Sequence, residues 1–151
     1  MTPGTAGYFH WLRDLNALYR GCEVLHRTDT RPDGFEWIDC LDTEHSVIAF
    51  MRRGEGETPL VFICNFTPVA REDFRLGLQD GGYYREVLNS DAEVYGGSGV
   101  GNGGKVATEV VSHHGRPHSA LLRLPPLGGV GSWVYRSISG ECTYSCATVV
   151  R

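Results

Sequence analysis

The sequence lacks the features that would direct a chain to a membrane or to nucleic acid. No stretch of the 151 residues approaches the roughly 20 consecutive apolar residues of a membrane-spanning helix. The N-terminal segment has no basic region followed by an apolar one, so no secretory signal peptide is expected. Lys and Arg number 14 against 18 Asp and Glu, which gives a net charge of −4, whereas phosphate binding requires a basic patch. We therefore expect a cytoplasmic protein whose partners include neither nucleic acid nor a membrane.

Cysteine is sparse and odd in number. The five cysteines are Cys22, Cys40, Cys64, Cys142 and Cys146. Because no secretory signal is present, we interpret all five as reduced thiols. Cys40 and Cys64 lie in apolar runs, where a thiol packs as a small hydrophobic group. Cys142 and Cys146 have no second pair of ligands nearby, so a zinc site is not expected there.

Groupings of catalytic side chains are also missing. The carboxylates are scattered along the chain, and Asp39, Asp42 and Glu44 flank a turn, where we expect them to face solvent. Nothing marks any two of them as the pair, about 5–5.5 Å apart, that retaining glycosidases use. No Ser-His-Asp or Cys-His arrangement is apparent. The sequence thus identifies no catalytic residue, and it predicts neither a metal nor a cofactor.

Two motifs match the sequence patterns of ligand sites but lack the structural context that such sites need. Residues 99–104, GVGNGG, match G-x-G-x-x-G, but the β-prone segment KVATEVV follows where a dinucleotide site needs a helix. Residues 112–119, SHHGRPHS, contain His113, His114 and His118. A short loop with a proline inside it rarely makes three histidines converge on a metal. We interpret both motifs as loops between strands.

Apolar residues recur at steps of three and four over residues 8–22, which predicts an amphipathic helix. The apolar positions are Tyr8, Trp11, Leu12, Leu15, Leu18, Tyr19 and Cys22. A helix of about 15 residues is marginal alone, and this face would form an exposed apolar patch. We therefore expect the helix to dock on the rest of the chain or to self-associate.

After about residue 30 the apolar period changes to two, which is typical of β-strands. Strands are predicted at 35–40, 46–53, 59–67, 73–78, 83–89, 105–111, 120–126 and 132–137. Turn residues separate them, so the fold class is mainly β, an antiparallel β-sandwich of about eight strands preceded by one N-terminal α-helix. Residues 59–67 are apolar enough for a central strand, and Pro125 and Pro126 should end their strand. Residues 138–151 are expected to form an irregular tail.

Trp37 is the first candidate for a binding residue. It alternates with Phe35, so both should share one face of a strand. Aromatic rings of this kind stack on the apolar faces of sugar rings. The alternative is that Trp37 belongs to the core, which the usual burial of tryptophan favours. Tyr95 is a second candidate by the same reasoning.

A series of motifs resembles the C-terminal β-domain of bacterial 1,4-α-glucan (glycogen) branching enzymes. The motifs are RDLNALYR (13–20), GFEWID (34–39), SVIAFMRR (46–53), NFTPV (65–69), REVLNSD (85–91), SHHGRPHS (112–119) and WVYR (133–136). They follow the order and spacing of that family over about residues 7–136, which makes the resemblance specific.

The resemblance implies a domain organisation and a role. Residues 1–26 would be a remnant of the last helix of a catalytic (β/α)8 barrel, and residues 27–137 the C-terminal β-sandwich. Branching enzymes cut an α-1,4 bond and transfer the chain to a 6-hydroxyl, using carboxylates on barrel loops that no position here matches. The expected role is therefore to support the barrel and to contact glycogen or another α-glucan weakly at Trp37 and Tyr95. The alternatives are a stand-alone glucan-binding module and a part that complements a separately encoded barrel.

Overall fold

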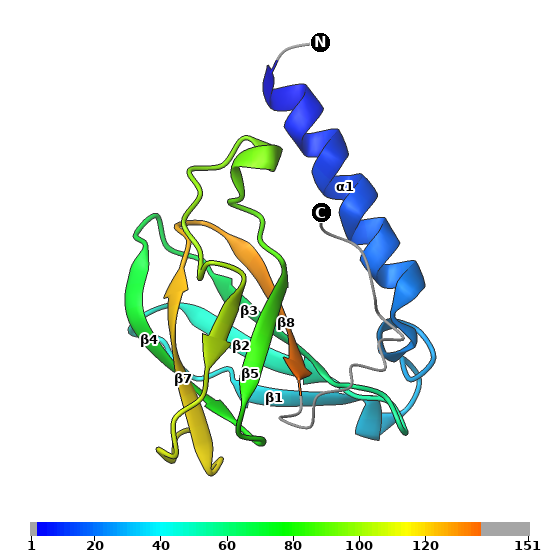
Figure 1. The fold of residues 1–151 in the computed structure, drawn as a ribbon, viewed down its shortest axis with the longest axis vertical. Coiled ribbons are helices and arrows are strands. Elements are labelled where there is room, and N and C mark those ends of the chain that lie inside the picture. Colours follow the sequence, from blue (N-terminus) through cyan, green and yellow to red (C-terminus); the bar gives the residue numbers. More distant parts are fainter. Residues whose placement is uncertain (1–2, 137–151) are drawn as a thin grey trace.

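The structure is a computed structural model that describes residues 3–136, and side chains are described over residues 6–128 (Figure 1). The helices are α1 (Pro3–Gly21) and the short 3-10 helices η1 (Glu23–Leu25), η2 (Pro32–Gly34) and η3 (Glu93–Tyr95). The strands are β1 (Phe35–Asp39), β2 (Val47–Arg52), β3 (Leu60–Asn65), β4 (Arg71–Leu78), β5 (Tyr83–Leu88), β6 (Lys105–Ala107), β7 (His118–Leu124) and β8 (Gly129–Arg136). The tail predicted at 138–151 lies outside the described residues.

The eight strands form two antiparallel sheets, which confirms the predicted fold class. The larger sheet has the order β1-β2-β3-β8-β5-β6, and the smaller consists of β4 and β7. Strand β3 lies between β2 and β8 and is buried at five of its six positions, as expected of a central strand. Strand β7 ends at Leu124, directly before Pro125, because proline cannot donate to a ladder.

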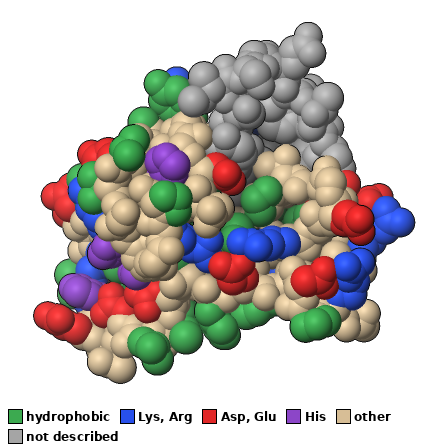
Figure 2. Space-filling model, turned by 90° about the horizontal axis from the view of Figure 1, so that it is seen from below, with side chains coloured by type: hydrophobic (Ala, Val, Ile, Leu, Met, Phe, Trp, Pro, Cys, Tyr) green, Lys and Arg blue, Asp and Glu red, His purple; other side chains and the backbone are tan. Residues whose placement is uncertain are grey.

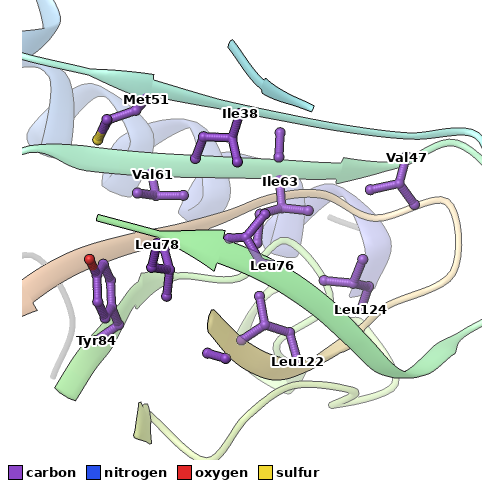
Figure 3. Packing of buried hydrophobic residues seen from close by; sticks show 12 residues of the cluster. Ile38, Val47, Met51, Val61, Ile63, Leu76, Leu78, Tyr84, Leu122 and Leu124 are labelled. Carbon is purple, nitrogen blue, oxygen red and sulfur yellow. The ribbon is translucent and has the colours of Figure 1, made fainter. Parts of the chain in front are cut away.

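The main core fills the space between the two sheets (Figure 3). Alternate residues of β2, Val47, Ala49 and Met51, point inward and are almost fully buried. They belong to one cluster with Leu76 and Leu78 of β4. Burying one such side chain stabilises the fold by about 1.5–3 kcal/mol, so this cluster holds the two sheets together.

Helix α1 runs beside the sandwich (Figure 1), and its C-terminal end packs on the outer face of the larger sheet. Leu18 and Cys22 at its C-terminal end are buried against Leu60, Phe62 and Leu88 of that sheet. The helix is therefore docked and not free, as predicted, although Tyr8 and Tyr19 of its predicted apolar face are exposed. It extends from Pro3, five residues before the predicted start, and proline suits the first turn of a helix. Within the described residues, no helix is long and apolar enough to cross a membrane.

The cysteines depart from expectation at one position. Cys40 and Cys64 are thiols and form no disulfide, as predicted. Cys22 is fully buried and disulfide-bonded, so the expectation of five reduced thiols is wrong for Cys22. Its partner lies outside the described residues. Pairing between distant cysteines depends on how the elements pack, and sequence spacing does not reveal it.

Candidate functional site

A row of aromatic rings crosses the outer face of the larger sheet from its edge strand β1. Trp37 lies opposite Phe50, and Phe50 opposite Phe62, in the strand register. The Phe50 and Phe62 rings stack with centroids 5.1 Å apart, and Trp37 meets Phe50 edge-on at 5.9 Å. Phe35 contacts Trp37 edge-on at 4.9 Å, which confirms that these two share a face. We call Phe35, Trp37, Phe50 and Phe62 the aromatic row.

The aromatic row is open at one end and covered at the other. Trp37 is 49% exposed and Phe35 is 38% exposed, whereas Phe62 is only 8% exposed. Phe62 belongs to the cluster that α1 covers, whereas Trp37 lies on β1, the edge strand of the sheet. The interpretation of Trp37 as a core residue is therefore wrong. Its ring can accept the flat apolar face of another molecule.

Tyr95 occupies a different place, between η3 and α1. Its ring packs edge-on against Trp11 with centroids 5.2 Å apart, and its hydroxyl donates to Asp14 Oδ2 at 2.9 Å. Burial and this hydrogen bond raise the pKa of Tyr95. Arg13 donates to the other Asp14 oxygen at 2.8 Å, and this bond, together with that from Tyr95, lowers the pKa of Asp14 against the effect of burial. The polar end of Tyr95 is thus already occupied by the helix.

Close approach of α1 to η3 depends on a glycine. A Cβ at Gly7 would come within 2.1 Å of the Tyr95 carbonyl oxygen. Gly7, Trp11, Asp14 and Leu18 follow one another at helical spacing, so one stripe of α1 meets both η3 and the sheet. The structure therefore places the two predicted binding residues apart, with Trp37 in the aromatic row and Tyr95 in the helix contact.

The glycine-rich segment is a loop, as its context predicted. It follows η3 and leads into strand β6, whereas a dinucleotide site requires a helix. Asp91 organises its start by accepting from the Ser98 hydroxyl at 2.6 Å and from the Val100 amide at 2.9 Å. Asn102 then joins the two sheets, because its amide donates to Glu86 of β5 and to the Arg123 carbonyl of β7.

The carboxylates around residue 40 are less exposed than expected. The Asp39 and Asp42 side chains are only 14% and 16% exposed, so the expectation that they face solvent is wrong. Asp39 lies 3.3 Å from His114 Nε2, and Asp42 contacts His45 Nδ1 at 2.8 Å. Packing of distant loops on this turn explains the burial. Among the described residues, no three His, Cys, Asp or Glu side chains are placed to hold a metal ion.

Comparison with known proteins places these features in a family. Residues 37–131, more than half of the chain, match the family described as alpha amylase, C-terminal all-beta domain. The chain belongs to this family. The identification agrees with the observed all-β architecture and with the resemblance read from the sequence motifs.

Three relatives of this alpha-amylase C-terminal domain share one name. A 1,4-alpha-glucan branching enzyme GlgB from Cereibacter sphaeroides is 52% identical over 128 residues, which is 85% of this chain and 18% of the relative. The enzyme of the same name from Burkholderia thailandensis is 50% identical over 85% of this chain and 16% of the relative. That from Aquifex aeolicus is 47% identical over 83% of this chain and 20% of the relative. The chain thus spans about a fifth of the length of the curated relatives it matches.

Proposed function

We propose that this chain is the C-terminal all-β domain of a 1,4-α-glucan branching enzyme of glycogen biosynthesis. In this account it acts in the cytoplasm, supports the catalytic barrel and has no activity alone. Residues 1–26 are the last helix of the barrel, and residues 27–137 are the sandwich on which that helix rests. The high identity to enzymes of that name over most of the chain supports the proposal.

The observation that carries the supporting role is the second apolar side of α1. Tyr8, Phe9 and Tyr19 are 60%, 54% and 48% exposed although the stripe of the helix that contains Leu18 is buried on the sandwich. A helix that is apolar on two sides is typical of one buried between two bodies. The barrel is the body we propose for the exposed side. Self-association through the same side chains is the alternative, and sedimentation of the isolated chain distinguishes them.

A chimaeric enzyme tests the proposal. Residues 7–136 would replace the matching segment of the Cereibacter sphaeroides relative, and branching activity and thermal stability would be measured. We expect an active enzyme in which Tyr8→Ser with Tyr19→Ser lowers the melting temperature several degrees more than in the isolated chain. Asn16→Ser, on an exposed part of the same helix, is the control. Equal effects of the tyrosine substitutions in both proteins would contradict a barrel contact.

The second candidate function is a glucan-binding module, which the exposed end of the aromatic row favours. Phe35 and Trp37 offer two partly exposed aromatic rings that meet edge-on at the edge strand of the sheet. In this account Trp37 stacks on a glucosyl ring and Tyr95 contributes only through its exposed ring edge. Because cytosolic thiols are kept reduced, the binding and activity assays should contain a reductant that opens the Cys22 disulfide.

A further inference from the structure

We propose that a pocket at one end of the sandwich, away from the aromatic row, binds a glucosyl residue of an α-glucan. The choice of sugar rests on the proposed function, whereas the pocket rests on the structure alone. Its volume is about 210 Å³, and its lining includes Asp42, His45, Arg71, Phe74 and His113. These residues come from the β1–β2 loop, the start of β4 and the loop before β7, which are distant in sequence. Figure 2 shows histidine and acidic side chains gathered toward one end of the face it presents.

One wall of this end pocket is a fixed aromatic corner. The His45 and Phe74 rings meet edge-on with centroids 6.4 Å apart. Asp42 fixes His45 by accepting from its backbone amide at 2.9 Å and by contacting its ring Nδ1 at 2.8 Å. Phe74 is partly buried against the main core. The corner therefore offers an apolar ring surface beside a carboxylate whose position does not change.

A pair of histidines, His113 and His114, also lines the pocket. The His113 and His114 rings lie with centroids 4.1 Å apart. Gly77 N–H donates to His114 Nδ1 at 3.2 Å, so the proton is on Nε2, which faces Asp39 at 3.3 Å. Burial and the neighbouring His113 lower the pKa of His114, so it is neutral at pH 7. His114 is thus held in place, and the His113 ring packs against it.

One buried polar atom of the pocket has no hydrogen-bond partner among the described residues. It is Arg71 Nε, and an unpaired buried donor is rare, although Nη2 of the same guanidinium donates to the His45 carbonyl oxygen at 3.2 Å. The Asp73 side chain is exposed and the His113 side chain is partly exposed, so both can be reached by a ligand. In addition, Asp73 and His114 adopt positive φ angles of 55° and 48°. Such backbone is costly for residues other than glycine and is common at binding sites.

The chemistry of the lining favours a neutral ligand rich in hydroxyl groups. Carboxylates and guanidinium groups line the pocket together, so neither a strong anion nor a strong cation is matched by the surroundings. A sugar hydroxyl can donate to Asp73 and accept from Arg71 or His113, and the apolar ring face can rest on Phe74. The aromatic corner and the histidine pair are preorganised, which reduces the ordering cost of binding.

The test is titration of the isolated chain with maltotriose, followed by backbone amide NMR. We expect shifts at residues 73–74 and 113–114, and an at least fivefold weaker affinity in His113→Ala. Asp73→Gly should weaken binding similarly while the fold is kept, because glycine relieves the positive φ. Asp73→Asn is the matched variant, since asparagine tolerates this φ and keeps hydrogen-bonding capacity. His118→Ala, outside the pocket lining, is the control for a general histidine effect.

The outcomes separate this proposal from the proposed function. One result would overturn the end pocket: amide shifts confined to residues 35–37 and 50, with the maltotriose affinity unchanged in His113→Ala and Asp73→Gly. The glucan-binding surface would then be the one at Trp37. An absence of any maltotriose response in the wild-type chain would also overturn the end pocket. Neither result bears on whether the chain completes a branching enzyme, because the chimaera tests that through activity.

Discussion

The Tyr95 hydroxyl donates to Asp14 across 81 residues of sequence, at 2.9 Å, and so links the η3 loop to the helix. We expect Tyr95→Phe to lower the free energy of unfolding by about 1 kcal/mol, the value of one partly exposed hydrogen bond to a carboxylate. Chemical denaturation measures it. A change within error of zero would show that the Trp11 ring contact alone holds the loop on the helix.

Asp14 should also give stability a specific pH dependence. Its pKa is lowered in the folded state, chiefly by the hydrogen bond from Arg13. Its contribution is therefore complete above the unfolded-state pKa of about 3.9 and is lost as the pH falls through the lower folded-state pKa. We expect Asp14→Asn to be less stable than wild type at pH 7 and to lose less stability on acidification. If the free energies of unfolding of the two proteins fell by the same amount between pH 7 and pH 3, the result would contradict this prediction.

Gly7 should be intolerant of alanine although alanine favours helices. The new Cβ would lie 2.1 Å from the Tyr95 carbonyl oxygen, so η3 must move away from α1. We expect Gly7→Ala to destabilise by about 2 kcal/mol, since overpacking outweighs a gain of about 1 kcal/mol in helix propensity. Gly21→Ala is the matched control, because nothing lies within 4 Å of a Cβ there. Equal stability of the two variants would mean that α1 does not dock as described.

Asn65 should be sensitive to change because its side chain is buried and hydrogen-bonded. It is 2% exposed, its amide donates to the Val69 and Pro125 carbonyls, and its oxygen accepts from Thr67. Asn65→Asp keeps the shape but turns a carboxylate toward two carbonyl oxygens. We expect a loss of about 3 kcal/mol in unfolding free energy. Retention of wild-type stability would contradict the hydrogen-bond assignment.

Both the stability and the maltoheptaose affinity of a Trp37 variant should identify Trp37 as a surface residue. Because it is half exposed, we expect Trp37→Ala to cost about 1 kcal/mol, less than the about 3–5 kcal/mol expected for Phe62→Ala beneath α1. Maltoheptaose affinity is measured on the same folded variant. Weaker affinity supports a glucan contact at the aromatic row, whereas unchanged affinity would remove Trp37 from the binding surface.

The strands could be predicted from the sequence because alternation and turn residues are local signals. Seven predicted strands agree with the structure to within about two or three residues at each end. The exception is 105–111, where β6 ends at Ala107. Val110 and Val111 are 89% and 44% exposed. The β-prone segment therefore continues beyond the residues that pair with another strand. A strand needs that partner, and local propensity does not supply it.

The sites could be predicted only in part. Alternation placed Phe35 and Trp37 on one face, but whether that face is covered depends on how far α1 reaches across the sheet. The end pocket was not predicted, because it needs Asp42, Arg71 and His113 to meet through the packing of two sheets. The histidine-rich motif contributes His113 to that end of the molecule, but the sequence indicated only a loop between strands there and no sugar site.

In the proposed function, this domain contributes to branching only together with a catalytic barrel. The most direct measurement follows the fall in iodine absorbance of amylose with the purified isolated chain and, in parallel, with the chimaeric enzyme. We expect no change with the isolated chain at any concentration and a steady fall with the chimaera. Branching turnover by the isolated chain, proportional to its concentration and absent from a matched mock purification, would contradict the claim.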